Sequence, residues 1–253
     1  MTEIKGPGHT LRRTVLDNGL RVLTSAMPHS RAVTISAFVG AGSRYEQEDL
    51  AGISHLVEHL VFKGTKRRPN PREISAAVEG VGGEINAGTE QELTVYWCKV
   101  AKPYWEDSLD LLLDMLRNSL YDETDIDKER LVVMEEQRMV NDYPAQKVDV
   151  LIDQMLWPDH PLGREISGSP ESLARISRDL IIDQVSRFHT PSNIVLSLAG
   201  DVDHEQVLHK ADSLSNGWAP GPAPEWAPFT LSQSAPQLCT QFRKTEQAHF
   251  SAA

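Results

Sequence analysis

The chain has 253 residues, of which 40% are hydrophobic, so it can form one large domain or two small ones around a sizeable core. Its net charge of −11 argues against nucleic acid as the main partner, and leaves open whether the acidity attracts basic peptides or only keeps the protein soluble. It has no run of 18 apolar residues, and residues 1–9 lack the apolar segment of a signal peptide, so we expect a cytoplasmic protein with no membrane partner.

Strand and turn signals dominate the first forty residues. Residues 14–17 and 20–24 are rich in β-forming types, and the Asn-Gly pair between them is a strong signal for a hairpin turn. Residues 32–39 are expected to form a third strand. A helix should follow, with Asp49 as one candidate for its N-cap.

This helix contains the run His55-Leu56-Val57-Glu58-His59. At about 100° per residue, His59 lies about 40° from His55 and Glu58 about 60° the other way, so the three polar side chains share one arc. Two imidazoles one turn apart can hold a zinc ion, and a carboxylate beside them can take a proton from water, as in the inverted zinc-peptidase motif. Because such pairs also occur by chance, a third ligand is needed from elsewhere. The opposite side of the helix can pack into a core and carries Ile53, Leu56, Val57, Leu60 and Val61.

The remaining elements alternate between helices and strands without a strict βαβ pattern. Pro71 suits the first turn of one helix, and Thr124 can cap another. This mixture predicts an α+β fold with helices packed on a largely antiparallel sheet. Helices are expected over 71–81, 105–120, 124–141, 145–156, 178–188 and 204–214, and strands near 84–87, 93–100 and 194–199.

The expected helix at 124–141 carries acidic side chains on an apolar face. Glu135 lies about 100° from Glu136, toward the edge of that face. A buried carboxylate is costly unless it is paired or binds a metal, which draws attention to Glu136. A wide apolar face with acidic residues at its rim explains the same pattern. The residues within about 60° of Glu136 are Glu129, Val132, Val133, Met139 and Val140.

Two other features of the chain bear on its organisation. Cys98 and Cys239 are far apart in sequence and are expected to be free thiols, with Cys98 in a strand core rather than acting as a nucleophile. Residues 218–228 include four prolines, which is typical of a stiff, extended linker but also of a surface loop at a domain edge.

Several motifs together resemble the pitrilysin/insulinase family of zinc peptidases, with processing-peptidase-like bacterial members as the nearest match. The first is the His55–His59 run followed by Phe62-Lys63-Gly64-Thr65. The family's third ligand lies in an E-R-x-x-x-x-x-E context, which Glu129-Arg130 through Glu136 matches. The segments 82–89 and 193–202 also match in the right order, so the resemblance spans about residues 10 to 215.

The resemblance implies a set of site residues. Zinc would be held by His55, His59 and Glu136, with Glu58 as the general base and Glu129 supporting the ligands from behind. Residues Asn86, Ala87, Gly88 and Thr89 would form an edge strand that binds an extended peptide by β-augmentation. The alternative for that strand is a plain edge with a glycine that permits close packing.

The resemblance also implies a division of the chain. Residues 1–217 would form the N-terminal catalytic domain of the pitrilysin/processing-peptidase fold, 218–236 a linker, and 237–253 the start of a truncated second homologous domain, with 238–251 strand-like. Members of the family that this chain resembles usually have two homologous halves that close around the peptide. We therefore expect a peptide substrate and a second homologous domain or subunit as partners.

Three functions are compatible with these patterns. The leading hypothesis is a zinc-dependent endopeptidase that hydrolyses extended peptides or leader sequences. The alternative is a non-catalytic or half-enzyme subunit that needs a partner or a missing C-terminal domain, although such members usually lose part of the motif that is complete here. An α+β binding module with a chance histidine pair would require Glu136 and the 82–89 segment to be coincidences.

Overall fold

A computed structural model describes residues 2–6, 9–222, 224–230, 233–244 and 246–253. Within these ranges the chain forms one seven-stranded sheet in the order β1-β2-β3-β7-β4-β6-β5. The neighbours β3 and β7 are parallel and every other pair is antiparallel, which confirms the predicted largely antiparallel α+β fold. The strands are β1 (Thr2–Gly6), β2 (His9–Val15), β3 (Arg21–Ala26), β4 (Ala32–Val39), β5 (Glu84–Thr89), β6 (Thr94–Ala101) and β7 (Ile194–Gly200).

The first hairpin follows the predicted turn. Val15 of β2 pairs with Arg21 of β3, and Gly19 in the turn between them has a φ of +88°, a conformation that glycine adopts without strain. Strand β1 was not predicted and extends the sheet by pairing with β2. It lies at one edge of the sheet, and β5 lies at the other.

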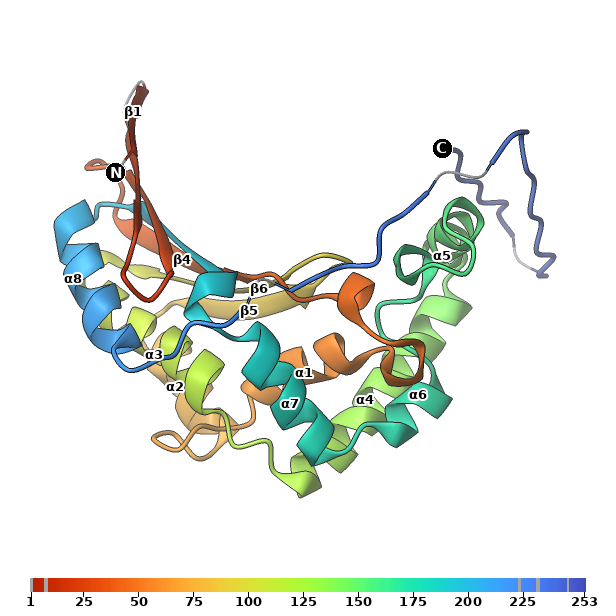
Figure 1. Ribbon diagram of the computed structural model, residues 1–253, viewed down its shortest axis with the longest axis horizontal. Helices are drawn as coiled ribbons and strands as arrows, with labels where there is room; N and C mark the ends of the chain where they lie inside the picture. Colours follow the sequence, from red (N-terminus) through yellow and green to blue (C-terminus); the bar gives the residue numbers. More distant parts are fainter. Residues whose placement is uncertain (1, 7–8, 223, 231–232, 245) are drawn as a thin grey trace.

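Eight α-helices are present in the described parts of the chain, and most of them lie on one side of the sheet, whereas α5 lies beyond its end (Figure 1). Alternate side chains of the central strands are buried beneath them, whereas the other face of the sheet is only half-buried. In the described residues, no helix has the length and apolar character needed to cross a membrane. The helices are α1 (Ile53–Val61), α2 (Pro71–Glu79), α3 (Trp105–Asn118), α4 (Glu123–Asp142), α5 (Pro144–Leu156), α6 (Pro170–Arg175), α7 (Arg178–Phe188) and α8 (His204–Ser215).

The helix starts correct two predictions. Asp122, rather than Thr124, caps α4 and accepts a hydrogen bond from the Thr124 backbone N–H. Asp49 does not cap α1 because it lies in a short 3₁₀ turn, Glu48–Leu50, and Gly52 takes the cap position instead. The short helix α6 was not predicted; it begins with a capping box in which Ser169 and Ser172 each bond the other's backbone N–H.

Beyond α8 the described residues form neither helix nor strand, so the strand expected at 238–251 is wrong for the part of it that the structure describes. The segment runs along the molecule toward α5 (Figure 1). It is held by side chains of the folded core: the Trp218 indole donates to the His189 carbonyl, and the Trp226 ring packs edge-on against Tyr45. The proposed division at residues 217 and 236 stays a prediction.

Candidate metal centre

Helix α1 has an apolar side that packs into the core and a polar side that carries His55, Glu58 and His59. All five predicted core residues are at most 2% exposed, which fixes the rotation of the helix and confirms the predicted packing side. The two histidines therefore emerge on the opposite side, where they face Glu129 and Glu136 of α4.

The start of α1 is held by a buried carboxylate. The two oxygens of Glu46 accept hydrogen bonds from the backbone N–H groups of Gly52 and Ser54, at 2.9 and 2.8 Å. Gly52 has a φ of +94°, and a β-carbon there would lie 2.5 Å from the Ser167 carbonyl oxygen, so the position requires glycine. These hydrogen bonds fix the position of the first turn of α1, and with it the position of His55, one residue after Ser54.

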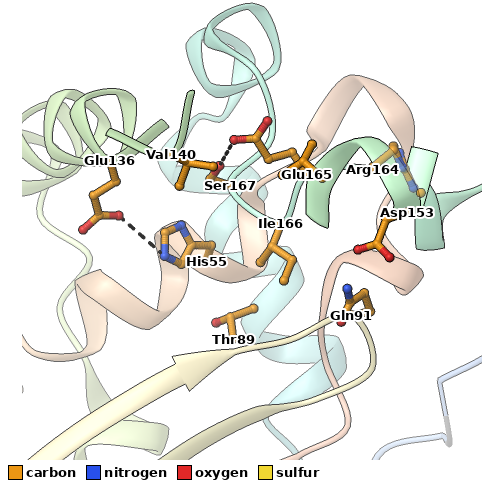
Figure 2. Close-up of a pocket in the computed structure, with 12 residues that line it drawn as sticks. His55, Thr89, Gln91, Glu136, Val140, Asp153, Arg164, Glu165, Ile166 and Ser167 are labelled. Carbon is orange, nitrogen blue, oxygen red and sulfur yellow. Dashed lines mark hydrogen bonds and ion pairs between the residues drawn. The ribbon is translucent and has the colours of Figure 1, made fainter. Parts of the chain in front are cut away.

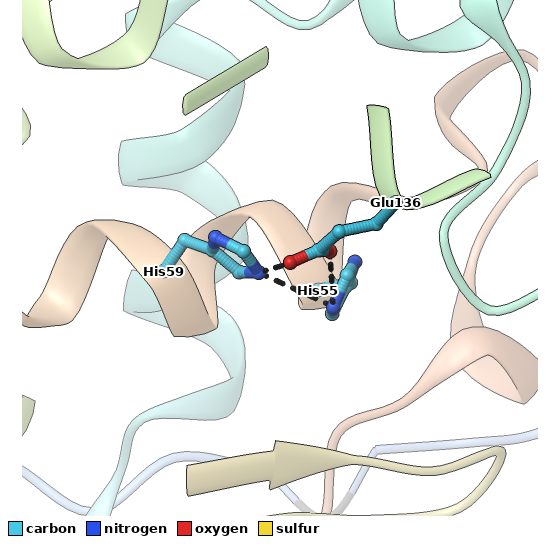
Figure 3. Close-up of side chains that lie close together, drawn as sticks. All are labelled: His55, His59 and Glu136. Carbon is cyan, nitrogen blue, oxygen red and sulfur yellow. Dashed lines mark hydrogen bonds and ion pairs between the residues drawn. The ribbon is translucent and has the colours of Figure 1, made fainter. Parts of the chain in front are cut away.

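Three donor atoms from two helices converge (Figure 3). The Nε2 atoms of His55 and His59 are 3.3 Å apart, and Glu136 Oε2 lies 3.7 and 3.6 Å from them. Zinc bonds of 2.0–2.1 Å in a tetrahedron separate the ligand atoms by about 3.3–3.5 Å. The nitrogen–nitrogen distance falls in this range and the two nitrogen–oxygen distances are slightly longer, so the set has the chemistry of a zinc site and nearly its spacing. Burial, and then the neighbouring His59, lower the pKa of His55 to about 4, which keeps its imidazole neutral near pH 7 and able to bind a metal.

The rear nitrogens of the two imidazoles have different surroundings. His59 Nδ1 lies 3.2 Å from Glu129 Oε2. The other oxygen of Glu129 is 2.8 Å from Lys63 Nζ, a contact that sequence reasoning missed. His55 Nδ1 is buried and finds no hydrogen-bond partner in the described parts of the chain.

The expected base lies beside the donors and is held from the sheet. Thr89 of β5 donates its hydroxyl to Glu58 Oε2 at 2.6 Å. Burial raises the pKa of Glu58, and the nearby Glu136 raises it further, while the Thr89 hydrogen bond and His59 lower it. A carboxylate whose pKa is raised in this way is a stronger base than one in water.

Helix α4 does not present the apolar face that the sequence suggested. Its buried residues are Ile126, Glu129, Val133 and Gln137, whereas Val132 and Met139 are 43% and 60% exposed. The side chain of Glu136 is 37% exposed, so the expectation of a buried carboxylate was wrong. Glu136 lies at the border of the packed face, and its approach to the histidines is set by how α4 packs against α1.

A cavity of about 320 Å³ opens beside the donors. In Figure 2, Glu136 and His55 lie at one end of the drawn cluster and Asp153 and Gln91 at the other. Apolar side chains line part of the space between them, so a ligand side chain of moderate size fits next to the metal donors. The other residues that line the cavity are Thr89, Val140, Val150, Gly163, Arg164, Glu165, Ile166 and Ser167.

Comparison with known proteins places this geometry in a family. The sequence model described as insulinase, peptidase family M16, matches residues 21–169. The chain belongs to the insulinase family. A second model of the same family, described as the peptidase M16 inactive domain, matches residues 175–253. Membership in this peptidase family, with the complete motif in α1, supports a protease function at the family level.

Relatives of this insulinase-family chain are named as proteases. It is 36% identical to an uncharacterized zinc protease of Streptomyces coelicolor, over 95% of this chain and 53% of that protein. It is 33% identical to an uncharacterized zinc protease of Bacillus subtilis, over 94% and 58%, and to a probable mitochondrial-processing peptidase subunit beta of Arabidopsis thaliana, over 94% and 42%. The chain therefore spans about half the length of the curated relatives it matches.

Solved structures share the fold of this insulinase-family chain. A protease from Helicobacter pylori matches with a TM-score of 0.80 at 24% identity, covering 85% of this chain and 53% of that one. A putative M16-like peptidase from Alicyclobacillus acidocaldarius matches with a TM-score of 0.76 at 22% identity, covering 88% and 53%. At these identities the likeness establishes the fold alone.

Proposed function

We propose that this chain is the catalytic half of a zinc-dependent endopeptidase that hydrolyses extended peptides, leader sequences among them. The observation that carries the proposal is the convergence of His55 Nε2, His59 Nε2 and Glu136 Oε2 at nearly tetrahedral spacing, with Glu58 next to them on α1. When bound, zinc supplies Lewis acidity, which polarises a carbonyl group and makes a water molecule easier to deprotonate.

The chain's own residues would handle the proton. Glu58 would accept it from the attacking water at the carboxylate and pass it to the leaving amine when the peptide bond breaks. Because Thr89 occupies one oxygen of Glu58, the other is the one available for this transfer. The raised pKa of Glu58, caused first by its burial, favours uptake of that proton.

The substrate would bind along β5. This strand ends the sheet and pairs with β6 on one side, so its other edge can form main-chain hydrogen bonds with an extended peptide. A β-carbon added to Gly88 would meet no atom within 4 Å, so close packing is not the reason for glycine at this position. Asn86, Ala87 and Gly88 are therefore proposed to line the peptide, whereas the Thr89 side chain is already bonded to Glu58.

A second homologous half would complete the substrate chamber. This part of the proposal is supported by the shorter span of the chain compared with its relatives, of which it covers 42–58% in the three cases above. The half could belong to the same polypeptide or to a partner subunit. Activity should therefore be measured with the chain alone and with such a half added.

The metal assignment can be tested with two adjacent glutamates. The variant Glu136→Gln removes a proposed ligand, whereas Glu135→Gln makes the same chemical change on a side chain that is 64% exposed and pairs with Arg138. Metal analysis and titration against a zinc chelator should show strong loss of zinc affinity only for Glu136→Gln. Equal zinc content and affinity in both variants would contradict the site.

The base assignment can be tested with Glu58→Gln. This variant should keep zinc and lose cleavage of a mixed peptide library that the parent cleaves, while chelation should abolish cleavage by the parent. A fully active Glu58→Gln protein would refute Glu58 as the base. A zinc-loaded parent that cleaves nothing, even with the second half present, would favour the non-catalytic alternative.

A further inference from the structure

In the part of the chain that the structure describes, Lys63 forms an ion pair with Glu129 and with none of the three donor residues. It follows α1 by two residues and is one helical turn beyond His59, so it continues the row formed by His55 and His59. Its backbone N–H donates to the Leu60 carbonyl at 3.0 Å, which keeps this residue in the turn that ends the helix.

The ammonium group of Lys63 is directed at one buried side chain. Its Nζ lies 2.8 Å from Glu129 Oε1, and Glu129 Oε2 lies 3.2 Å from His59 Nδ1. The side chain of Glu129 is only 10% exposed and that of Lys63 29%, so water competes weakly for these contacts. The two oxygens of one carboxylate are thus divided between Lys63 and His59.

This division fixes the direction of Glu129. With Oε1 held by Lys63, Oε2 is left facing the ring of His59, where it accepts a hydrogen bond from Nδ1–H. A histidine protonated at Nδ1 presents the lone pair of Nε2, which is the atom that faces His55 and Glu136. Without Lys63, Glu129 would be a buried carboxylate with one partner fewer and would be free to turn away.

We propose that Lys63 is a positioning residue that acts on the metal site through Glu129, by holding the carboxylate that orients His59. The proposal rests on the proposed zinc site. It extends the site by one residue beyond the ligands and their direct supports, and predicts that the Lys63 cation matters although it is not among the metal donors.

The test measures zinc affinity of the full chain by competition with a chelator. Lys63→Met keeps the length of the aliphatic stem but removes the charge, and should weaken zinc binding about 10-fold, the lower range found for groups that support metal ligands. Lys63→Arg should restore most of the affinity because it keeps a cation that can donate to Glu129. Lys66→Met is the matched control, since Lys66 is exposed and only three residues away.

A double-mutant cycle separates action through Glu129 from a general effect of charge. In a Glu129→Gln background, Lys63→Met should cause little further loss, because the carboxylate it holds is already gone. An equal 10-fold loss in both backgrounds, an equal loss for Lys66→Met, or parent-like affinity of Lys63→Met would each overturn the proposal.

A second measurement does not depend on zinc. In metal-free protein, long-range ¹H–¹⁵N NMR spectra should report a His59 ring protonated at Nδ1 in the parent and in Lys63→Arg, and a mixture of tautomers in Lys63→Met. Unchanged tautomers in Lys63→Met would overturn the proposal. If the parent bound no zinc, the proposed function would fail, and this spectrum would still decide the role of Lys63.

Discussion

The carboxylate of Glu46 offers a direct test of how the start of α1 determines the site. In Glu46→Ala, the backbone N–H groups of Gly52 and Ser54 lose their acceptors at 2.9 and 2.8 Å. Glu46 is only 7% exposed, so water cannot readily replace it. A buried donor left unsatisfied costs about 1–3 kcal/mol, so the two together predict a loss of about 2–6 kcal/mol in the free energy of unfolding.

This loss is large compared with the total stability of an ordinary domain, about 5–15 kcal/mol, and should appear as a lower urea midpoint at an unchanged slope. Because the freed turn lies one residue before His55, zinc affinity should fall as well. Glu48→Ala is the control, since Glu48 is exposed, and should change stability by less than about 0.5 kcal/mol. A Glu46→Ala protein within that margin of the parent would refute the reasoning.

Further predictions concern a buried histidine, the hydroxyl beside the base, and the two thiols. Burial lowers the pKa of His189 from 6.5 to about 4, so the unfolded chain binds this proton first as the pH falls, and the free energy of unfolding should drop by up to about 3 kcal/mol between pH 6.5 and 4. Urea unfolding of His189→Gln should show a smaller loss over this range, and the same dependence on pH as in the parent would contradict the assignment. In a preparation that cleaves peptide, Thr89→Val should lower kcat roughly 10-fold with zinc content unchanged, and Thr89→Ser, which keeps the hydroxyl, should have a kcat close to that of the parent. A change in KM alone would argue that Thr89 binds substrate instead of orienting Glu58. Burial raises the pKa of Cys98 to about 12, so a thiol reagent should modify the exposed Cys239 at once and Cys98 only after unfolding. Rapid modification of both cysteines in the folded protein would contradict the burial of Cys98.

Much of the secondary structure followed from local patterns. The Asn-Gly turn, the helix over 178–188 and the leucine-rich helix α3 all lie where the sequence predicts them, because turn chemistry and the spacing of apolar residues act over a few neighbours. Several of the misses were local as well. Strand β1 and helix α6 are short, and the cap of α4 differs from the prediction by two residues because a neighbouring aspartate, Asp122, competes with Thr124 for the same role.

For the metal site, the sequence by itself determined which side of α1 carries the polar triad. A fixed turn of about 100° per residue puts His55, Glu58 and His59 opposite five apolar residues, and burial of those residues leaves one orientation for the helix. The role of Glu136 could be predicted only from the resemblance to a family, since nothing local ties it to residues that lie 77 or more positions earlier.

The contacts between elements were decided by the tertiary structure alone. The packing of α4 on α1 brings Glu136 to the imidazoles from a half-exposed position and turns Glu129 toward His59 and Lys63. The edge position of β5 brings Thr89 to Glu58. Such contacts depend on the distance and rotation between elements, which close packing of the whole core fixes. The periodic pattern of residues within one element does not predict these distances and rotations.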